Sequence, residues 1–330
     1  MRFLLVSIGS MGDTFPFVTV GEALKRRGHE VFICCNGQFQ KFVESRGLKF
    51  VESLAASEYQ TFIENQKHWS QRRALKGMGE ILINQVEKVY HAIADHHLPG
   101  QTVVAAQGYA VGARVAQEKL GIPTATVHLQ PLWFRSIHNH PELADWCPLW
   151  FPRTIDRILD FFIDRNIGRP VNAFRATLGL APMNYVLKYW WNSPDLVMGL
   201  FPSWYESPQP DWPKNVLLTG FPIPPYNPDL FDAREVEAFL NAGDRPIVFN
   251  QSSVTLDDRY FAICAEVARK VGRRAIFLTP HLSQLPTDLP NTIKSFPFVP
   301  LEWLLPRSAL HVHHGGVGTL RTLSPPACRN

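Results

Sequence analysis

The 330-residue sequence lacks several features that would assign its class directly. Its five cysteines form no CxxC pair and have no regular spacing, and Cys34 and Cys35 lie in an apolar run, so we expect buried thiols in a reducing cytoplasm. It has no dense Lys/Arg run, and its net charge of +4 is small, which argues against nucleic acid as a partner. The apolar start is too short for a signal peptide, and no run approaches the ~20 apolar residues of a membrane-spanning helix. These absences predict a cytoplasmic protein.

The residues that are present indicate a folded α/β protein. Hydrophobic residues make up 45% of the chain and charged residues 19%, the balance of a protein with a core. Residues 3–52 alternate short apolar runs with helical spacing, which predicts a doubly wound parallel sheet. The same alternation returns at residue 245. We therefore expect a Rossmann-like domain over 1–221, a Pro-rich linker over 222–244 and a shorter Rossmann-like domain over 245–330.

The segment GSMGDTFP (9–16) forms the predicted loop between the first strand and a helix that we expect from Phe17. Open α/β sheets bind ligands at the carboxyl ends of their strands, and the glycines permit close backbone approach. Asp13 has two interpretations here, a helix-capping carboxylate or a catalytic base. The spacing is not GxGxxG and no acidic residue ends the second strand, so an NAD site is disfavoured.

The segment HHGGVGT (313–319) follows the last predicted strand. Glycine amides at a helix N-terminus favour a pyrophosphate, with His314 and Thr319 as further donors. The P-loop lysine is missing, which disfavours NTP hydrolysis. No Cys, Asp or Glu joins the histidines, so we expect no metal site.

Together these motifs carry a resemblance. HHGGVGT with FVPLEWLLPRSA (298–309) resembles the donor-binding signature of the family 1, UDP-glycosyltransferase-like, glycosyltransferases, and residues 9–31 look like the N-terminal loop of that family. The similarity is nearest to the bacterial macrolide, sterol and rhamnosyl-lipid branch. It implies the GT-B fold: two Rossmann-like domains that face a cleft, with the acceptor bound by the N-terminal domain and the donor by the second.

The resemblance assigns donor-binding residues position by position. His314 would contact the phosphates of a UDP- or dTDP-hexose, and the diphosphate would be held by residues in two loops: Gly316, Val317, Gly318, Thr319, Ser252 and Ser253. Phe298 would stack on the base and Val299 would offer backbone hydrogen bonds, although core packing is the alternative for Phe298. No cofactor or metal is implied.

On the acceptor side, Asp13 stands where many plant relatives place a catalytic His, which implies that Asp13 is the base of an inverting transfer. A base there requires a raised pKa in a poorly solvated cleft. Some relatives place an Asp where Gln107 stands to orient that His, and with no His at position 13 we expect no such partner to be needed.

The resemblance and the local pattern also indicate acceptor-binding residues, namely Ser10, His128, Gln130 and Trp133. For His128 the alternative is a buried core histidine. The aromatic stretch that includes Trp133, Trp146 and Trp150 suits an apolar acceptor or a peripheral membrane contact, and helix packing is its alternative.

The implied activity is the transfer of a hexose from a nucleotide-sugar to a hydroxyl of a lipophilic acceptor such as a sterol, macrolide or lipid. A catalytically inactive remnant, or a non-catalytic nucleotide-sugar-binding or partner protein, is the alternative.

The last residues, LSPPACRN, hold two prolines where the family continues a helix. One choice of codons for residues 322–330, translated in another frame, gives ALAAGVPQ, which resembles the family's continuation. We therefore expect a C-terminal truncation through a shifted reading frame, an incomplete second domain, weak donor binding and little transfer by these residues alone.

Overall fold

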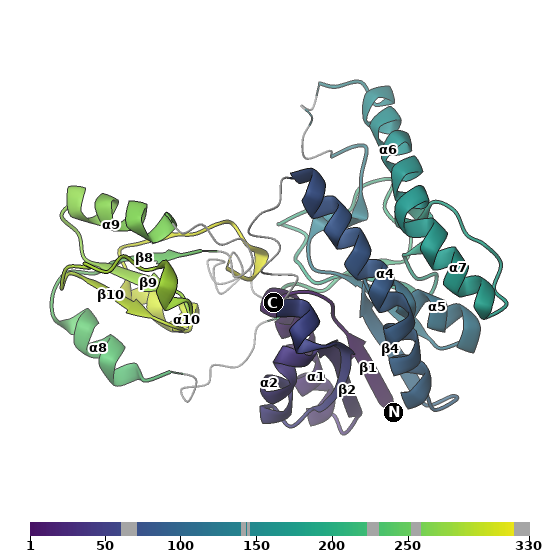
Figure 1. The fold of residues 1–330 in the computed structure, drawn as a ribbon, viewed down its shortest axis with the longest axis horizontal. Helices are drawn as coiled ribbons and strands as arrows, with labels where there is room; N and C mark the ends of the chain where they lie inside the picture. Colours follow the sequence, from purple (N-terminus) through teal and green to yellow (C-terminus); the bar gives the residue numbers. More distant parts are fainter. Residues whose placement is uncertain (61–70, 140–142, 144–145, 223–230, 252–258, 320–330) are drawn as a thin grey trace. The chain divides into compact units, whose positions relative to one another are not determined.

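The computed structural model describes residues 1–60, 71–139, 143, 146–222, 231–251 and 259–319. The chain divides into two compact units, Met1–Ile223 and Pro224–Pro326, and each is described by itself (Figure 1).

The N-terminal unit is built on a parallel sheet. Its described residues form seven strands in the order β3-β2-β1-β4-β5-β6-β7. Their bounds are β1 Arg2–Val6, β2 Glu30–Asn36, β3 Lys49–Leu54, β4 Thr102–Gln107, β5 Thr124–His128, β6 Leu196–Gly199 and β7 Val216–Leu218. The chain moves outward from β1 to β3 and then returns to the other side of β1 at β4. The predicted doubly wound sheet is confirmed.

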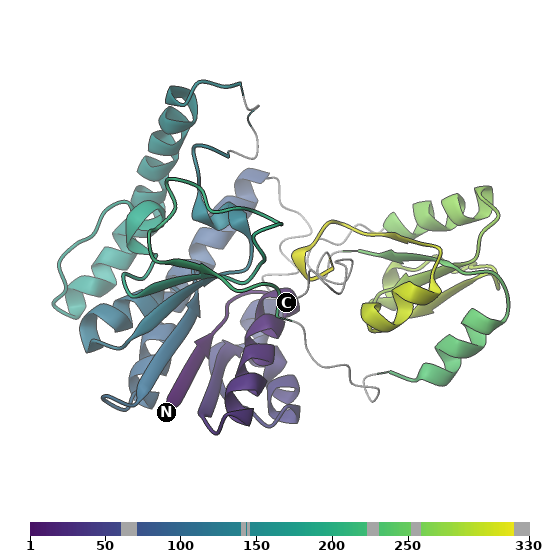
Figure 2. The same ribbon diagram turned by 180° about the vertical axis from the view of Figure 1, so that it is seen from behind.

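Helices cover both faces of this sheet (Figures 1 and 2). Their bounds are α1 Met11–Arg26, α2 Gln40–Ser45, α4 Gln71–His96, α5 Val111–Leu120, α6 Trp150–Ile163 and α7 Arg169–Thr177, with short 3₁₀ segments η1 Gly37–Phe39 and η2 Pro131–Phe134 and π-helical segments η3 Asp164–Gly168 and η4 Val186–Trp190. Alternate residues of β1 point to opposite faces: Leu4 packs in a cluster with α4 and α5, and Leu5 in one with α1 and α2.

Helix α1 begins earlier than the sequence predicts. We expected a loop over residues 9–16 and a helix from Phe17, but the helix starts at Met11 and Pro16 lies inside it. Ser10 is its N-cap and Asp13 its third residue, a capping-box arrangement that satisfies amides of the first turn. Pro16 is the sixth helical residue and has no N–H to donate, so the helix lacks the hydrogen bond that this residue would make to the Gly12 carbonyl.

The C-terminal unit contains a smaller parallel sheet, with described strands in the order β10-β9-β8-β11. Its elements are α8 Ala233–Asn241, β8 Ile247–Asn250, α9 Tyr260–Lys270, β9 Ala275–Leu278, η6 Leu282–Gln284, β10 Ile293–Phe296, α10 Leu301–Leu304, η7 Leu305–Arg307 and β11 Leu310–Val312. Helix α9 packs on one face and α8 with α10 on the other. Strand β11 is at the edge of the described sheet, and Leu310 and Val312 are exposed there.

The structure differs from the expected linker over residues 222–244. Helix α8 lies within that range, begins at the N-cap Asp232 and buries Val236 against β8 and β9. The Pro-rich composition of residues 222–229 predicts a linker, but the amphipathic spacing that follows it forms a helix. Among the described residues, no helix is both long enough and apolar enough to cross a membrane.

Candidate functional site

The strand order places the GSMGD segment at a reversal point of the first sheet. Strands β1 and β4 are neighbours, but the chain leaves β1 towards one edge and leaves β4 towards the other. Loops at the carboxyl ends of two such strands diverge and leave a crevice, which is where open α/β sheets bind ligands. Asp13 follows β1 and Gln107 ends β4, so both lie at this point.

The Asp13 carboxylate accepts three hydrogen bonds. Its Oδ2 accepts from the Ser10 amide at 2.8 Å and from the Ser10 hydroxyl at 2.9 Å, and its Oδ1 accepts from Gln107 Nε2 at 2.9 Å. Burial raises the pKa of Asp13, and the hydrogen bonds from Gln107 and Ser10 lower it in part. The two interpretations of Asp13 are therefore compatible: the carboxylate caps α1 and also carries the raised pKa that a base requires.

The Asp13 carboxylate lies so close to the backbone of residue 9 that only glycine fits there. Its φ is +121°, and a Cβ at this position would lie 2.5 Å from Asp13 Oδ2. A larger residue would meet both backbone strain and a side-chain clash. The glycine before Asp13 thus has a specific role in placing the carboxylate.

Gln107 is the residue whose role sequence analysis missed. We expected no partner for position 13, but the Gln107 amide donates to Asp13, and its Oε1 accepts from the Ile8 amide at 3.0 Å. The side chain is buried, so its orientation is fixed by these two contacts. Gln107 could have been found from its position at the end of β4, the strand beside β1. That inference requires the strand order, which the sequence alone does not provide.

An aromatic pair lies just after the carboxyl ends of β4 and β5. Tyr109 follows β4 and Trp133 lies in η2 after β5, and their rings meet edge to face at 4.5 Å. Burial and the negative charge of Asp13 raise the pKa of Tyr109. Trp133 and Gln130, both expected at the acceptor site, are partly exposed, whereas Tyr109 was not anticipated.

His128 does not line an accessible surface, contrary to the acceptor-binding expectation. The ring is only 2% exposed, its Nε2 lies 2.8 Å from Asn192 Oδ1, and it packs against Phe134 and Trp191. Burial lowers the pKa of His128 to about 4. The alternative interpretation, a buried core histidine with a satisfied hydrogen bond, describes this residue.

The HHGGVGT segment occupies the corresponding place in the second unit. Strands β8 and β11 are neighbours at the reversal point of that sheet, and His311 Nε2 lies 2.6 Å from Asn250 Oδ1 across them. After β11, residues 313–316 form an irregular loop in which Gly315 has a φ of +80°, and residues 317–319 are helical. The Thr319 amide donates to the Gly316 carbonyl at 2.9 Å. The expected order of strand, glycine loop and helix start is present.

His314 lies over the glycine loop. A Cβ on Gly316 would collide with the His314 ring, so glycine is needed there for the ring to take this position. Desolvation and the neighbouring His313 lower the pKa of His314, which makes a neutral ring the dominant form at neutral pH.

The remaining donor-side residues differ in their surroundings. Phe298 is 51% exposed, which disfavours the core-packing alternative. Val299 is buried in the cluster with α8 and α10, so a contact from this residue to a ligand would go through its backbone. Ser252 and Ser253 lie outside the described residues. Within the described part of the chain, no group of three or more His, Cys, Asp or Glu side chains could hold a metal ion.

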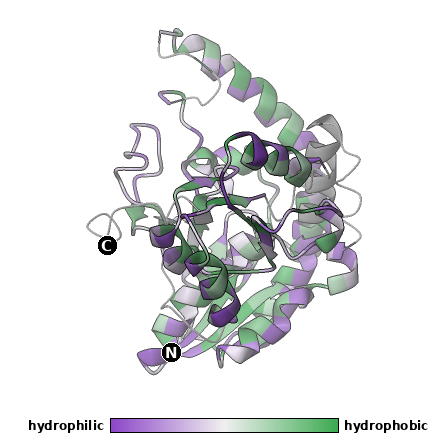
Figure 3. Ribbon diagram, turned by 90° about the vertical axis from the view of Figure 1, so that its left-hand side faces the viewer, coloured by the Kyte–Doolittle hydropathy of each residue, from purple (hydrophilic) through white to green (hydrophobic). Residues whose placement is uncertain are grey.

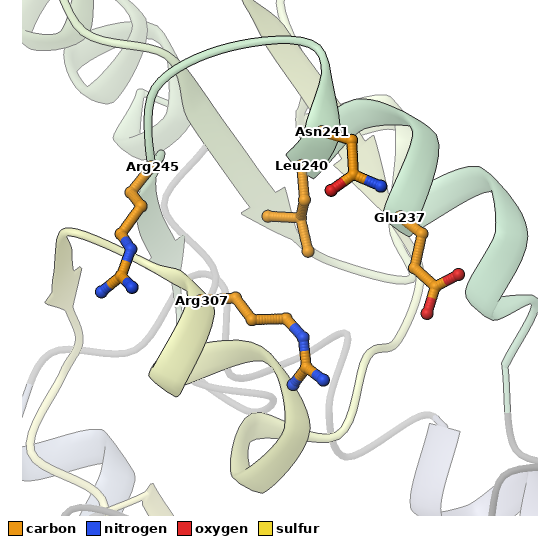
Figure 4. Close-up of a pocket in the computed structure, with 5 residues that line it drawn as sticks. All are labelled: Glu237, Leu240, Asn241, Arg245 and Arg307. Carbon is orange, nitrogen blue, oxygen red and sulfur yellow. The ribbon is translucent and has the colours of Figure 1, made fainter.

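A shallow pocket of the second unit is not part of this site. It is lined by Glu237, Leu240, Asn241, Arg245 and Arg307 (Figure 4). Arg245 precedes β8 and Arg307 precedes β11, so the pocket lies at the amino ends of these parallel strands. The HHGGVGT loop lies at the opposite, carboxyl end.

Known proteins share this architecture. Residues 3–138 match the glycosyltransferase family 28 N-terminal domain. The chain is 24% identical over 349 residues to sterol 3-beta-glucosyltransferase UGT80B1 of Arabidopsis thaliana, covering 99% of this chain and 55% of that protein. It is 25% identical to O-mycaminosyltylonolide 6-deoxyallosyltransferase of Streptomyces fradiae, covering 97% of this chain and 77% of that one.

Solved glycosyltransferase structures have a similar fold. The glycotransferase of kitacinnamycin superimposes with a TM-score of 0.70 at 17% identity, covering 97% of this chain and 77% of that one. The glycosyltransferase VinC in complex with dTDP superimposes with a TM-score of 0.60 at 18% identity, covering 98% and 78% of the two chains.

The chain thus spans just over half the length of the plant enzyme and about three quarters of the bacterial one. The sequence motifs resemble glycosyltransferase family 1, whereas the matched domain model is that of family 28. Both results indicate the same fold. Residues 3–138 are similar to the glycosyltransferase family 28 N-terminal domain, and the chain has the GT-B fold of the solved glycosyltransferases that it superimposes on.

Proposed function

We propose that this protein is an inverting glycosyltransferase that moves a hexose from a nucleoside diphosphate sugar to a hydroxyl of a lipophilic acceptor, with Asp13 as the base. The observation that carries the proposal is the Asp13 carboxylate at the reversal point of the first sheet, held by Ser10 and Gln107 and with its pKa raised by burial.

The geometry supports a specific division of work. The Asp13 carboxylate takes the proton of the acceptor hydroxyl while that oxygen forms a bond to the anomeric carbon from the face opposite the leaving group. The bond from the anomeric carbon to the diphosphate oxygen breaks, and its electron pair leaves with the nucleoside diphosphate. The raised pKa matches the carboxylate to this proton transfer, since a more basic carboxylate accepts the proton more readily.

The second unit would bind the donor. The amides of residues 316–318, with the Thr319 hydroxyl and the His314 ring, are donors for a diphosphate, and Phe298 offers an exposed ring for a base. A dTDP complex is known for the structural neighbour VinC. We therefore place dTDP- and UDP-hexoses first among candidate donors.

The acceptor class rests on the N-terminal unit. Tyr109 and Trp133 provide aromatic surface after the carboxyl ends of β4 and β5, and Gln130 provides a polar side chain on the segment that leads to Trp133. Aromatic walls with few polar groups are typical of sites for apolar small molecules. The relatives named for a sterol and for a tylonolide acceptor belong to the same class.

Asp13→Asn tests the proposal. The amide keeps an oxygen for the Ser10 bonds but cannot take a proton, so we expect transfer of glucose from UDP-glucose or dTDP-glucose to a sterol or macrolide panel to fall by about 10²–10⁴-fold. The fold should remain, which the melting temperature reports. Asp95→Asn, an exposed change on α4, is the matched control.

Transfer that Asp13→Asn leaves intact would reject the base assignment. Stabilisation by UDP or dTDP with no transfer or donor hydrolysis would instead identify a nucleotide-sugar-binding protein. Absence of both would reject the proposed function altogether.

A further inference from the structure

Helix α6 packs with its polar side inward. Asp160 and Asp156 contact the Arg135 guanidinium at 2.5 and 3.0 Å, and the Asp160 side chain is almost fully buried. Asp164, which follows the helix, accepts from the backbone amides of residues 185–186 at 2.7 and 3.0 Å. All three acidic groups of this segment are therefore turned towards the protein and engaged there.

The apolar side of α6 faces solvent. We call the α6 apolar face the side chains that are 39–65% exposed along the helix: Trp150, Phe151, Ile158, Leu159, Phe161 and Phe162. Trp146, shortly before the helix, is 85% exposed. Figure 3 shows the hydrophobic colouring along α6, which projects from the body of the N-terminal unit in Figures 1 and 2. Ile158, Phe161 and Phe162 follow the i, i+3, i+4 spacing and so lie on one side of the helix, where an exposed apolar patch marks an interaction surface.

Cationic side chains accompany this face. Arg153 and Arg157 lie one helical turn apart on α6, and Arg165 and Arg169 repeat the spacing in η3 and at the start of α7. All four are exposed, and no ion pair holds any of them within the part of the chain that the structure describes. Because the acids are turned inward, the outer surface of this segment is both apolar and positively charged.

We propose that the α6 apolar face docks onto the surface of an anionic lipid bilayer. A helix with aromatic and aliphatic side chains on one side and arginines beside them lies in the plane of the membrane interface, with its apolar side among the acyl chains. Its 14 residues are too few to span a bilayer. The arginines would meet anionic headgroups and add an electrostatic attraction to the apolar contact.

Charge and shape disfavour the other occupants. A second copy paired through the same face would bring two sets of unpaired arginines together, which is repulsive. A small apolar acceptor binds in a concave site, whereas a single projecting helix presents a convex surface. The proposal goes beyond the proposed function and does not require it, although a bilayer would also be a source of lipophilic acceptors.

The test is co-sedimentation of the full chain with phosphatidylcholine vesicles that contain phosphatidylglycerol, compared with phosphatidylcholine alone. We expect binding to the anionic vesicles that weakens with salt. Trp150→Ser with Phe161→Ser should reduce it by about tenfold or more, since each removes a large apolar contact. Ile263→Ser with Leu282→Ser, exposed apolar residues of the second unit, is the matched control and should leave binding unchanged.

A charge variant separates the two contributions. Arg153→Gln with Arg157→Gln should weaken binding to anionic vesicles by roughly thirtyfold and leave binding to neutral vesicles unchanged. The melting temperature confirms that each variant is folded.

Three results would overturn the proposal: no vesicle binding by the native chain, undiminished binding by the Trp150/Phe161 variant, or a concentration-dependent dimer that this variant abolishes, which would identify a second copy as the occupant. None of these readouts uses a nucleotide-sugar, so failure here is distinct from failure of the proposed transfer.

Discussion

The Gln107 amide, at the end of β4, donates a hydrogen bond to the Asp13 carboxylate in α1, and that pairing makes a direct prediction. Gln107→Glu keeps an oxygen for the Ile8 amide but replaces the donor to Asp13 with a second carboxylate. Like charges at hydrogen-bond distance raise the pKa of the pair. Because a base works only when deprotonated, the acid limb of kcat/KM should move to higher pH by about one unit or more.

The measurement is the pH profile of transfer. Gln101→Glu, an exposed position just before the same strand, is the control and should leave the profile unchanged. An unshifted limb in Gln107→Glu, with loss of activity at every pH, would mean that Gln107 has only a structural role.

Gly9 provides a second residue-scale prediction. Gly9→Ala should destabilise the protein by about 1–3 kcal/mol and reduce transfer, because the methyl group meets Asp13 Oδ2 and the backbone stays at φ +121°. Gly28→Ala is the matched control: its φ is +81°, but no atom lies within 4 Å of the added carbon. Equal effects in the two variants on stability and on transfer would show that backbone strain alone matters.

His128 makes stability depend on pH. Its folded-state pKa of about 4 lies below the ~6.5 of an unfolded histidine, so the unfolded chain binds more protons between these values. Its contribution is fully present above pH ~6.5 and is lost as the pH falls towards 4, by about 3 kcal/mol in total. His128→Gln should flatten that part of the curve of unfolding free energy against pH, and His138→Gln, an exposed histidine, should not. A curve that keeps its slope in His128→Gln would assign the dependence to other groups.

At the scale of elements, the orientation of α6 depends on one cation. Arg135→Met should lower the unfolding free energy by about 3 kcal/mol, because it leaves the Asp160 carboxylate buried without its partner. Adding Asp160→Asn to that variant should recover part of the loss. Denaturant unfolding of the native chain, the two single variants and the double variant gives the coupling free energy between the two side chains. Arg153→Met, exposed on α6, should change little. Additive effects of the two substitutions would contradict a clamp between these side chains.

The elements differ in how far the sequence alone predicted them. Buried parallel strands are short, nearly continuous apolar runs, and this pattern is visible in the sequence at residues 3–9 and 102–107. The structure has β1 and β4 at these positions. The start of α1 was missed because Pro16 looks like a first helical residue, whereas a Ser10–Asp13 cap starts the helix earlier. The outward apolar side of α6 has the same periodicity as an inward one, so the pattern could not reveal which side packs.

The candidate site shows the same limit. Asp13 and the glycine loop after β11 were found because each is a local motif at the end of a strand. The Asp13–Gln107 pair joins residues far apart in sequence, and only the order β1-β4 brings them together. His128 had a position that fits a site equally well, and burial decided against it.

On the scale of the whole molecule, the two units repeat one design. In each sheet the first strand of the unit lies beside the strand on which the chain reverses, β1 beside β4 and β8 beside β11. Each reversal point carries one proposed part of the chemistry, the base in the first unit and the diphosphate loop in the second. Because the two parts lie in separate units, ligand binding to one should be measurable without the other.

A nucleoside diphosphate should therefore stabilise the second unit selectively. In calorimetric unfolding with dTDP or UDP, we expect the transition of Pro224–Pro326 to rise in temperature, by the equivalent of about 1.4 kcal/mol when the ligand is tenfold above its dissociation constant. Ile276→Ala, in the core of that unit, identifies the transition because it lowers it without ligand. His314→Ala should remove the ligand-induced rise, and His281→Ala, an exposed histidine of the same unit, should retain it. A rise that survives His314→Ala, or that follows the transition of the N-terminal unit, would place the nucleotide away from the HHGGVGT loop and remove the main support for a donor site there.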